Sequence, residues 1–225
     1  MITTFTHSKE LNGPVLVTGA GGCIGSWVAA LLVKENIPVV AFDLSQDTRR
    51  LKLLIDDSEI EKIKWITSDI TDTKDVNKAI KDNNIQSIIH LAALQVPFCA
   101  ADPINGAKVN VVGTVNIFEA VRQYNIKHLV YASSVAAHGL ISKDMYMPTL
   151  YGAYKLCDEN IAHVYHQDWG VPSIGFRPGI AYGVGRDQGM TSKTTFAILA
   201  AASNQSYTIP FSGPISALHV REVAS

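Results

Sequence analysis

The sequence has little of what marks several classes of protein. It holds three cysteines in 225 residues, none in C-x-x-C spacing, so we expect neither a disulfide framework nor a zinc site. Its 19 basic and 20 acidic residues nearly balance and form no basic block, which argues against nucleic-acid or membrane-surface binding. No apolar run approaches the length of a bilayer span, and the first residues lack the apolar stretch of a signal peptide. We therefore expect a cytoplasmic protein with reduced thiols and no metal.

The stretch PVLVTGAGGCIG, at residues 14–25, carries the first functional signal. A short apolar run leads into Gly19, Gly22 and Gly25, after which the apolar spacing becomes helical. A helix N-terminus offers free N–H groups and the positive end of a dipole, and glycines allow a phosphate to approach closely. The pattern therefore predicts a pyrophosphate site; the alternative is a glycine-rich turn without a ligand.

Asp43 favours the pyrophosphate site over a turn without a ligand, because it follows a second apolar run at 37–42. An acidic side chain about 20 residues past the glycines accepts hydrogen bonds from an adenosine ribose. The same carboxylate repels a 2′-phosphate, so NAD is favoured over NADP. Arg49 and Arg50 are close enough in sequence to weaken that preference.

Short apolar runs alternate with segments of helical period along the chain, and 47% of the residues are hydrophobic. This alternation predicts an α/β fold with a Rossmann-type, doubly wound parallel sheet. The expected strands are 14–18, 38–42, 63–67, 86–91, 128–132 and 172–177, and the expected helices are 24–35, 73–81, 103–124 and 149–169. Beyond residue 177 the sequence becomes glycine-rich, followed by a helix at 193–203 and a strand near 207–210. We expect an NAD-binding domain at 1–177 and a small substrate-binding region at 178–225.

A few polar side chains are placed where chemistry is possible. Tyr151 and Lys155 lie four residues apart and so share a helix face, although such pairs also occur on ordinary helices. A tyrosine hydroxyl beside an ammonium can act as a general acid or base. Ser133 and Ser134 follow a predicted strand at the edge that borders ligands in open α/β sheets, or are simply turn residues. Asn110, among apolar residues, is either a buried hydrogen bonder or an anchor for a water relay.

The ordered motifs resemble those of extended short-chain dehydrogenases/reductases, the NAD-dependent epimerase/dehydratase family. They are TGAGGCIG, Asp43, SDI (68–70), HLAA (90–93), NVVGT (110–114), YASS (131–134), YGAYK (151–155) and RPG (177–179). The similarity extends from about residue 14 to LHVREVAS at 218–225. It implies that Tyr151 is the catalytic acid/base, Lys155 the cation that assists it, Ser134 the hydroxyl that orients substrate, and Asn110 a support of the site.

The same resemblance implies a set of cofactor contacts. Residues at the pyrophosphate would be Gly19, Gly22, Cys23, Ile24 and Gly25; at the adenosine, Asp43, Leu44, Asp69 and Ile70; and at the nicotinamide side, Leu91, Ala92, Ala93, Tyr151, Lys155, Pro178 and Gly179. From the residues alone, Asp69 is as well explained as a helix cap.

Departures from the family pattern limit which reactions and substrates we expect. Val135 and Ala136 follow Ser134 where dehydratases carry an Asp-Glu pair, so dehydration is not expected. Ile180 replaces an asparagine typical of nucleotide-sugar enzymes. We predict an NAD-dependent oxidoreductase that acts on a secondary alcohol or ketone of a sugar or sugar-acid-like substrate. The alternatives are an NAD-dependent (nucleotide-)sugar epimerase with transient oxidation and a non-catalytic NAD-binding module.

Two further expectations follow from the resemblance. Family members dimerise through two long helices, here 103–124 and 149–169, so we expect a homodimer. Members also continue beyond the equivalent of His219, so we expect this chain to lack part of the substrate-binding region.

Overall fold

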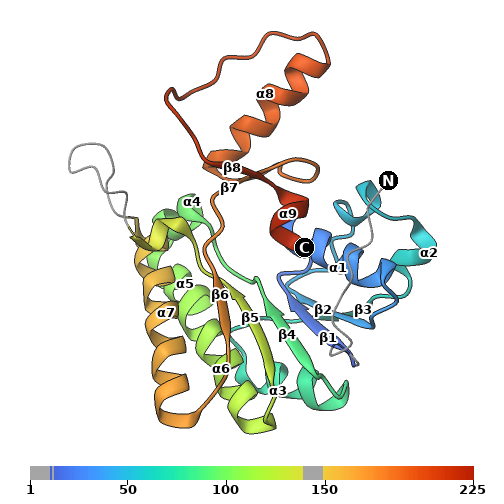
Figure 1. Ribbon diagram of the computed structural model, residues 1–225, viewed down its shortest axis with the longest axis vertical. Coiled ribbons are helices and arrows are strands. Elements are labelled where there is room, and N and C mark those ends of the chain that lie inside the picture. Colours follow the sequence, from blue (N-terminus) through green and yellow to red (C-terminus); the bar gives the residue numbers. More distant parts are fainter. Residues whose placement is uncertain (1–10, 12, 139–148) are drawn as a thin grey trace.

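The computed structural model describes residues 11, 13–138 and 149–225 and contains a six-stranded parallel sheet (Figure 1). The strand order is β3-β2-β1-β4-β5-β6, which confirms the doubly wound fold. The strands are β1 (Val15–Thr18), β2 (Val39–Asp43), β3 (Lys64–Thr67), β4 (Ser87–His90), β5 (His128–Ala132) and β6 (Ile174–Phe176). The order reverses between β1 and β4, and ligands bind such sheets outside the carboxyl ends at that point.

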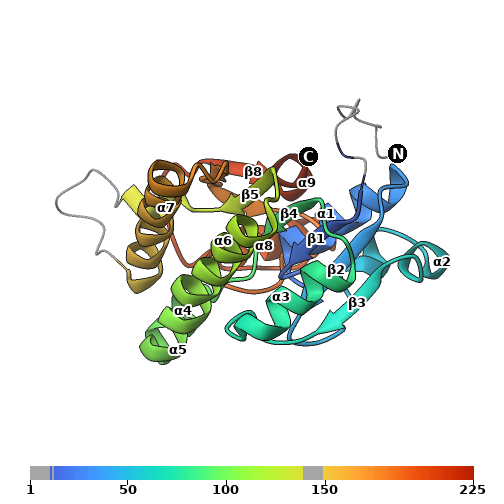
Figure 2. The ribbon, with the colours of Figure 1, turned by 90° about the horizontal axis from the view of Figure 1, so that it is seen from below.

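Helices cover both faces of this sheet (Figure 2). The helices of the sheet domain are α1 (Cys23–Lys34), α2 (Asp57–Ile60), α3 (Thr73–Asp82), α4 (Val96–Ala101), α5 (Pro103–Ala107), α6 (Gly113–Tyr124) and α7 (Leu150–Trp169). Leu16 and Phe42 belong to a core cluster shared with α3, α6 and α7, whereas Val15 and Val17 belong to a second cluster shared with α1. Alternate side chains of one strand point to opposite faces, so the central strands are buried on both sides.

The long helix expected at 103–124 contains an irregularity. Asp102 accepts a hydrogen bond from the Asn105 amide (3.0 Å), and Pro103 is the first helical residue, a favourable start. A π-helical segment, Lys108–Val112, then separates α5 from α6. Such single-turn π segments are frequent at functional sites, and this one carries Asn110.

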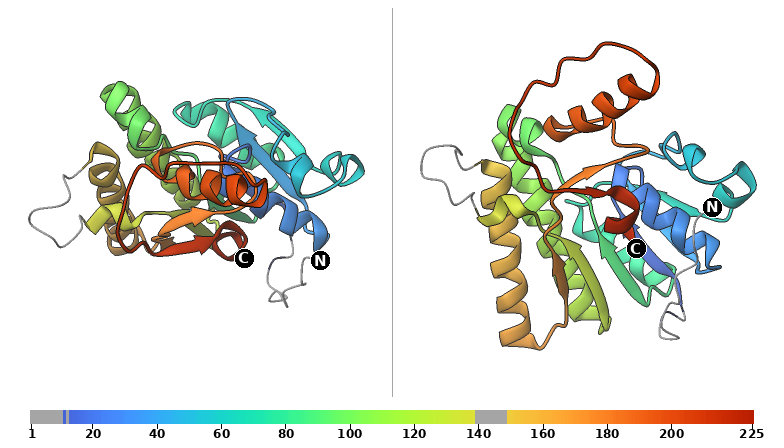
Figure 3. Two further views of the ribbon diagram at one scale, coloured as in Figure 1. Left: turned by 90° about the horizontal axis from the view of Figure 1, so that it is seen from above. Right: turned by 45° about the horizontal axis from the view of Figure 1, so that its top comes forward.

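The C-terminal segment lies beyond the carboxyl ends of the strands (Figure 3). It contains β7 (Ile180–Tyr182), α8 (Lys193–Ala202), β8 (Ala217–His219) and α9 (Val220–Ala224), and β7 pairs with β8 in parallel. The strand expected near 207–210 is wrong: those residues are exposed and irregular, because β7 pairs with β8 and no strand of the described chain lies beside them.

This segment is attached to the sheet domain by α9, which packs against α1. Trp27, Ala181 and Val220 form a small buried cluster there. Among the described residues, no helix is long and apolar enough to cross a membrane.

Candidate functional site

The glycine turn between β1 and α1 has no room for side chains. Gly19 has φ +67°, and a Cβ on it would lie 2.8 Å from the Ala92 amide nitrogen. A Cβ on Gly25 would lie 2.1 Å from the Gly19 carbonyl oxygen. Gly22 precedes α1 directly and provides no side-chain cap, so the N–H groups of the first turn are left for another acceptor. The turn therefore fits a pyrophosphate at a helix N-terminus.

Cys23 and Ile24 form the first residues of α1, at the position expected to meet the phosphates. Burial raises the pKa of the Cys23 thiol to about 11, although Arg186 and Arg50 lower it. The thiol is therefore neutral and adds no negative charge at the expected phosphate position.

Asp43 lies at the end of β2 beside this turn. Its Oδ2 accepts a hydrogen bond from the Gly21 amide (2.9 Å), and its Oδ1 accepts one from the Leu44 amide (2.8 Å). Each carboxylate oxygen has a further lone pair, so the acceptor that a ribose hydroxyl requires is present.

The two neighbouring arginines are already engaged. Arg50 is 9% exposed, and its guanidinium donates to the carbonyl oxygens of Gly21 (2.7 Å) and Gly185 (3.1 Å). It also pairs with Asp187 at 2.6 Å. Arg49 pairs with Asp47 at 2.8 Å. Arg50 is therefore not free to balance a 2′-phosphate, whereas Arg49 makes only an exposed surface pair.

A buried polar chain joins the ends of β1 and β4. Thr18 Oγ1 lies 2.7 Å from His90 Nδ1 and accepts hydrogen bonds from the amides of Leu91 (3.1 Å) and Ala92 (3.2 Å). His90 Nε2 lies 3.2 Å from Thr114 Oγ1. Burial, together with the nearby positive charge of Lys155, lowers the pKa of His90 to about 3. The neutral ring thus fixes the strand that leads into Leu91, Ala92 and Ala93.

Asn110 supports the next part of the same strand-to-helix loop. Its Oδ1 accepts a hydrogen bond from the Leu94 amide (2.7 Å), and its Nδ2 donates to the Leu94 carbonyl (3.0 Å). The side chain is fully buried, so both polar atoms serve to position the 91–94 loop. Through these bonds Asn110 joins the π-helical segment to that loop.

Tyr151 and Lys155 lie on the first turns of α7. The Lys155 Nζ lies 6.0 Å from the Tyr151 ring centroid, and Thr149 caps the helix by accepting from the Gly152 amide (3.0 Å). A Cβ on Gly152 would lie 2.5 Å from the Ala136 carbonyl oxygen. This close approach brings the start of α7 against the 133–137 segment.

Ser134 follows β5 and lies in that segment. Its Oγ accepts a hydrogen bond from the Ala136 amide (3.1 Å), whereas the Ser133 hydroxyl donates to Glu159. The Val135 amide donates to the Pro178 carbonyl (3.3 Å), which places Pro178 and Gly179 beside the same segment.

The expected adenine contacts are divided between surface and core. Asp69 does not cap α3: its Oδ1 accepts from the Thr71 amide (2.8 Å), while Asp72 caps the helix. The Ile70 side chain is buried in the core, and its carbonyl accepts from Asn116 Nδ2 (2.9 Å). Leu44 is largely exposed, as a contact at the rim of a site would be.

The structure adds a carboxylate that the sequence analysis missed. Asp158 is fully buried, and its Oδ2 lies 3.2 Å from Lys155 Nζ. Burial raises the pKa of Asp158 to about 6 against the lowering effect of Lys155. Its spacing of three from Lys155 places both on one helix face, which was the available signal.

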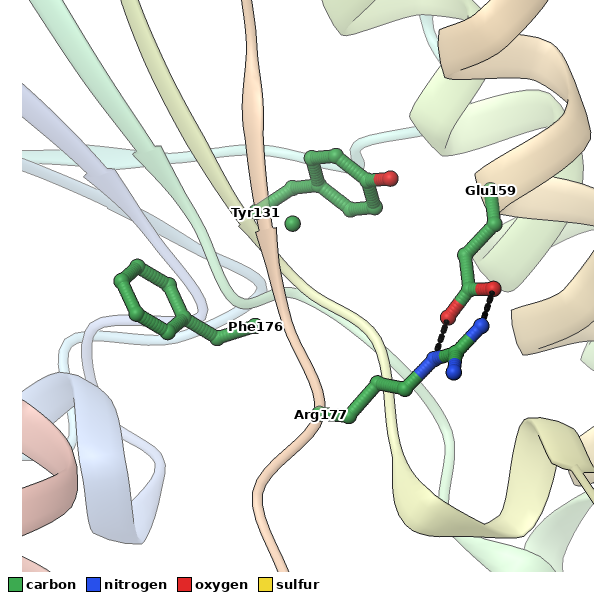
Figure 4. A pocket seen from close by; sticks show the side chains of 5 residues that line it. Tyr131, Glu159, Phe176 and Arg177 are labelled. Carbon is green, nitrogen blue, oxygen red and sulfur yellow. Dashed lines mark hydrogen bonds and ion pairs between the residues drawn. The ribbon is translucent and has the colours of Figure 1, made fainter.

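A separate cavity of about 460 Å³ lies between β6 and α7 (Figure 4). It is lined by Tyr131, Glu159, Gly175, Phe176 and Arg177. The figure shows the ion pair between Glu159 and Arg177, and Arg177 also donates to His138. None of the expected cofactor or catalytic residues lines this cavity, so it is distinct from the glycine turn. Among the described residues, no cluster of side chains suits a metal ion.

The chain is similar to known proteins in sequence and in fold. The model of the NAD dependent epimerase/dehydratase family matches residues 15–224. An uncharacterized protein of Methanocaldococcus jannaschii is 33% identical over 184 residues, which cover 75% of this chain and 56% of that protein. A UDP-glucose 4-epimerase of Lactobacillus helveticus is 35% identical over 130 residues, covering 57% of this chain and 38% of that enzyme.

Among solved structures, the Thermus thermophilus UDP-glucose 4-epimerase in complex with NAD is similar, with TM-score 0.78 and 25% identity. The match covers 94% of this chain and 72% of that one. The chain spans little more than half the length of several curated relatives that it matches, at 56%, 59% and 57%. Because the family model matches the chain from β1 to α9, the chain belongs to the NAD dependent epimerase/dehydratase family.

Proposed function

We propose that this chain binds NAD and transfers hydride to or from a secondary alcohol or ketone of a carbohydrate-like substrate. The observation that carries the proposal is the position of Tyr151 and Lys155 at the carboxyl edge of the sheet. There the glycine turn offers free N–H groups for a pyrophosphate, and Asp43 offers an acceptor for a ribose. A binding module without chemistry requires no acid/base pair at this position.

Each side chain has its own role when the substrate alcohol is oxidised. NAD, when bound, supplies the carbon that accepts hydride. Ser134 orients the substrate oxygen, and the Tyr151 oxygen accepts the proton of the alcohol. The ammonium of Lys155 stabilises the negative charge on the tyrosine oxygen and donates to a cofactor ribose. In the reduction direction the same tyrosine returns the proton.

The test compares two tyrosines on the same helix turn. Tyr151→Phe should lower turnover by roughly 10²- to 10⁴-fold while NAD affinity changes little, because only proton transfer is removed. Tyr154→Phe is the control, since the Tyr154 hydroxyl donates to the Pro103 carbonyl (2.9 Å) instead. Turnover is followed at the NADH absorbance band over a panel of sugars and sugar acids. Full turnover by Tyr151→Phe would contradict the assigned role.

Epimerisation is the second candidate, favoured by relatives named UDP-glucose 4-epimerase. In that case the hydride returns to the opposite face of the substrate, so an epimer forms without net NADH. Chromatography of the reaction mixture separates the two reactions. NAD binding without either product would support the non-catalytic module.

A homodimer is also proposed, through α6, α7 and the π-helical segment. Val112 and Val164 are 45% and 43% exposed on these elements, whereas Phe118 is fully buried in the core. Light scattering during gel filtration gives the mass directly, and a monomer at all concentrations would contradict the proposal.

A further inference from the structure

Asp158 has no part in the proton and hydride steps, yet it lies beside the residues that do. Tyr151, Lys155 and Asp158 are at positions i, i+4 and i+7 of α7 and therefore share one face. Asp158 is 0% exposed and Lys155 is 3% exposed, and Oδ2 and Nζ lie 3.2 Å apart. Lys155 is the ion-pair partner of Asp158, and Asp158 that of Lys155, within the described part of the chain.

The carboxylate is only partly satisfied by its surroundings. A side-chain hydrogen bond from Thr114 lowers its pKa, yet Oδ1 has no partner of good hydrogen-bond geometry among the described residues. Burying a carboxylate with a free oxygen costs stability, and apolar residues pack as well without that cost. Packing of α7 therefore does not account for an aspartate at this position.

The groups around the pair leave Lys155 as its main source of positive charge. The nearby groups are His90 on β4, which stays neutral; Thr114 on α6; Tyr131 on β5; Cys99 on α4; and Tyr151, Cys157 and Glu159 on α7 itself. Glu159 is paired with Arg177 and raises the pKa of Asp158 only slightly compared with burial. The charge state of the site is therefore set mainly between Asp158 and Lys155.

We propose that Asp158 is a positioning residue that holds the buried Lys155 ammonium toward the cofactor ribose and Tyr151. This rests on the function proposed above. One N–H of the ammonium points to Asp158 Oδ2, which leaves two for the ribose and the tyrosine oxygen.

The physical reason is the cost of an unpaired buried cation. Without the aspartate, a lysine that is 3% exposed has no counter-charge, so a displaced side chain is favoured. NAD binding must then restore the position of the ammonium. Because the pKa of Asp158 is about 6, the wild-type carboxylate is charged at higher pH and becomes protonated as the pH falls. The difference in NAD affinity between the two chains therefore grows as the pH rises and shrinks as the pH falls.

The first experiment measures NAD affinity by calorimetry on the 225-residue chain, without any substrate. Asp158→Asn should bind NAD about tenfold more weakly than the wild-type chain at about pH 8, and within about threefold at about pH 6. Asp168→Asn is the matched control, because Asp168 is an exposed carboxylate on the same helix. An unchanged dissociation constant for folded Asp158→Asn at both pH values would overturn the proposal.

The second experiment asks whether Asp158 acts through Lys155. In a Lys155→Met background, adding Asp158→Asn should change NAD affinity by less than about twofold. An equal loss in both backgrounds would indicate a structural role and would overturn the proposal. If Asp158→Asn fails to fold but the double variant folds, the coupling appears in stability and supports the proposal; if both fail, it is wrong.

These measurements require no turnover. A chain that shows the predicted coupling but no oxidoreductase activity would contradict the proposed function alone. Active enzyme without the coupling would contradict only the role of Asp158.

Discussion

The Gly21 amide nitrogen lies 2.9 Å from Oδ2 of Asp43. The residue expected to bind the adenosine ribose therefore also holds the glycine turn in place. Gly21 precedes α1 by two positions, and Asp43 is the last residue of β2. The two expected functions of this region, phosphate binding and ribose binding, are therefore mechanically linked.

Asp43→Ala should consequently weaken NAD binding more than the loss of a ribose contact alone. The substitution removes a charged acceptor and frees the Gly21 amide, each worth about 1.5–3 kcal/mol or less. We expect NAD affinity to fall by roughly 10²-fold, measured by calorimetry. Asp82→Ala, at the exposed end of α3, is the control. A change below about threefold for Asp43→Ala would contradict the assignment of the ribose site.

Alanine should be tolerated poorly at Gly25 in the glycine turn and well at Gly170, the C-cap of α7. Gly25→Ala forces a Cβ to 2.1 Å from the Gly19 carbonyl oxygen, so the turn must shift. Overpacking of this kind costs about 1–3 kcal/mol of unfolding free energy and should also weaken NAD binding. At Gly170 (φ +65°) nothing lies within 4 Å. Gly170→Ala should therefore cost about 1 kcal/mol and leave NAD affinity unchanged. Equal NAD affinities for both variants would contradict a pyrophosphate site at the glycine turn.

Local patterns were enough to predict the sheet and most of the helices. The strand-glycine-helix pattern at 14–35 and the Asp102-Pro103 helix start are decided by residues close in sequence. The π-helical segment at 108–112 was not predicted; its Asn110 bonds to Leu94, which lies 16 residues away, so local pattern does not show this contact. The strand misplaced at 207–210 has the same cause: β-propensity does not say which segment finds a partner.

Buried charges were the features that sequence reasoning missed in the site. Arg50 lies in a charged stretch whose sequence predicts exposure to solvent. Its contacts are nevertheless with Gly185 and Asp187, which lie 135 and 137 residues further along the chain. Asp158 is preceded by Cys157 and followed by Glu159, and only the packing of α7 shows which of them is enclosed. Long-range burial, rather than local pattern, decides the role of such residues.

Arg50 should contribute far more to stability than its neighbour Arg49. Arg50→Ala removes an enclosed guanidinium that joins the glycine turn to the 183–190 loop, at a cost of about 2–4 kcal/mol in unfolding free energy. Arg49→Ala removes an exposed pair with Asp47, which solvent screens, so the loss should be much smaller. Urea unfolding at neutral pH measures both. Equal losses for the two variants would show that the bridge contributes nothing beyond an ordinary surface pair.

His90 should make the protein sensitive to acid at a higher pH than carboxylates of ordinary pKa do. The pKa of the buried ring is lowered to about 3, whereas a histidine in the unfolded chain titrates near about 6.5. Between these values the unfolded chain binds a proton that the folded chain does not. Stability is therefore complete above about pH 6.5 and falls as the pH drops toward about 3.

Replacing the ring removes this slope. His90→Asn should be less stable than the wild-type chain at neutral pH, because Thr18 and Thr114 lose their partner. Its unfolding free energy should nevertheless fall less steeply between about pH 6.5 and 4. Asp158, with a pKa raised to about 6, has the opposite sign, since its stabilising effect is lost as the pH rises from about 4 to 6. Because that contribution is common to both chains, it cancels in their difference. Urea unfolding of both chains over this pH range gives that difference, and His163→Gln, at an exposed histidine, is the control. Parallel curves of unfolding free energy against pH would show that His90 is not held neutral.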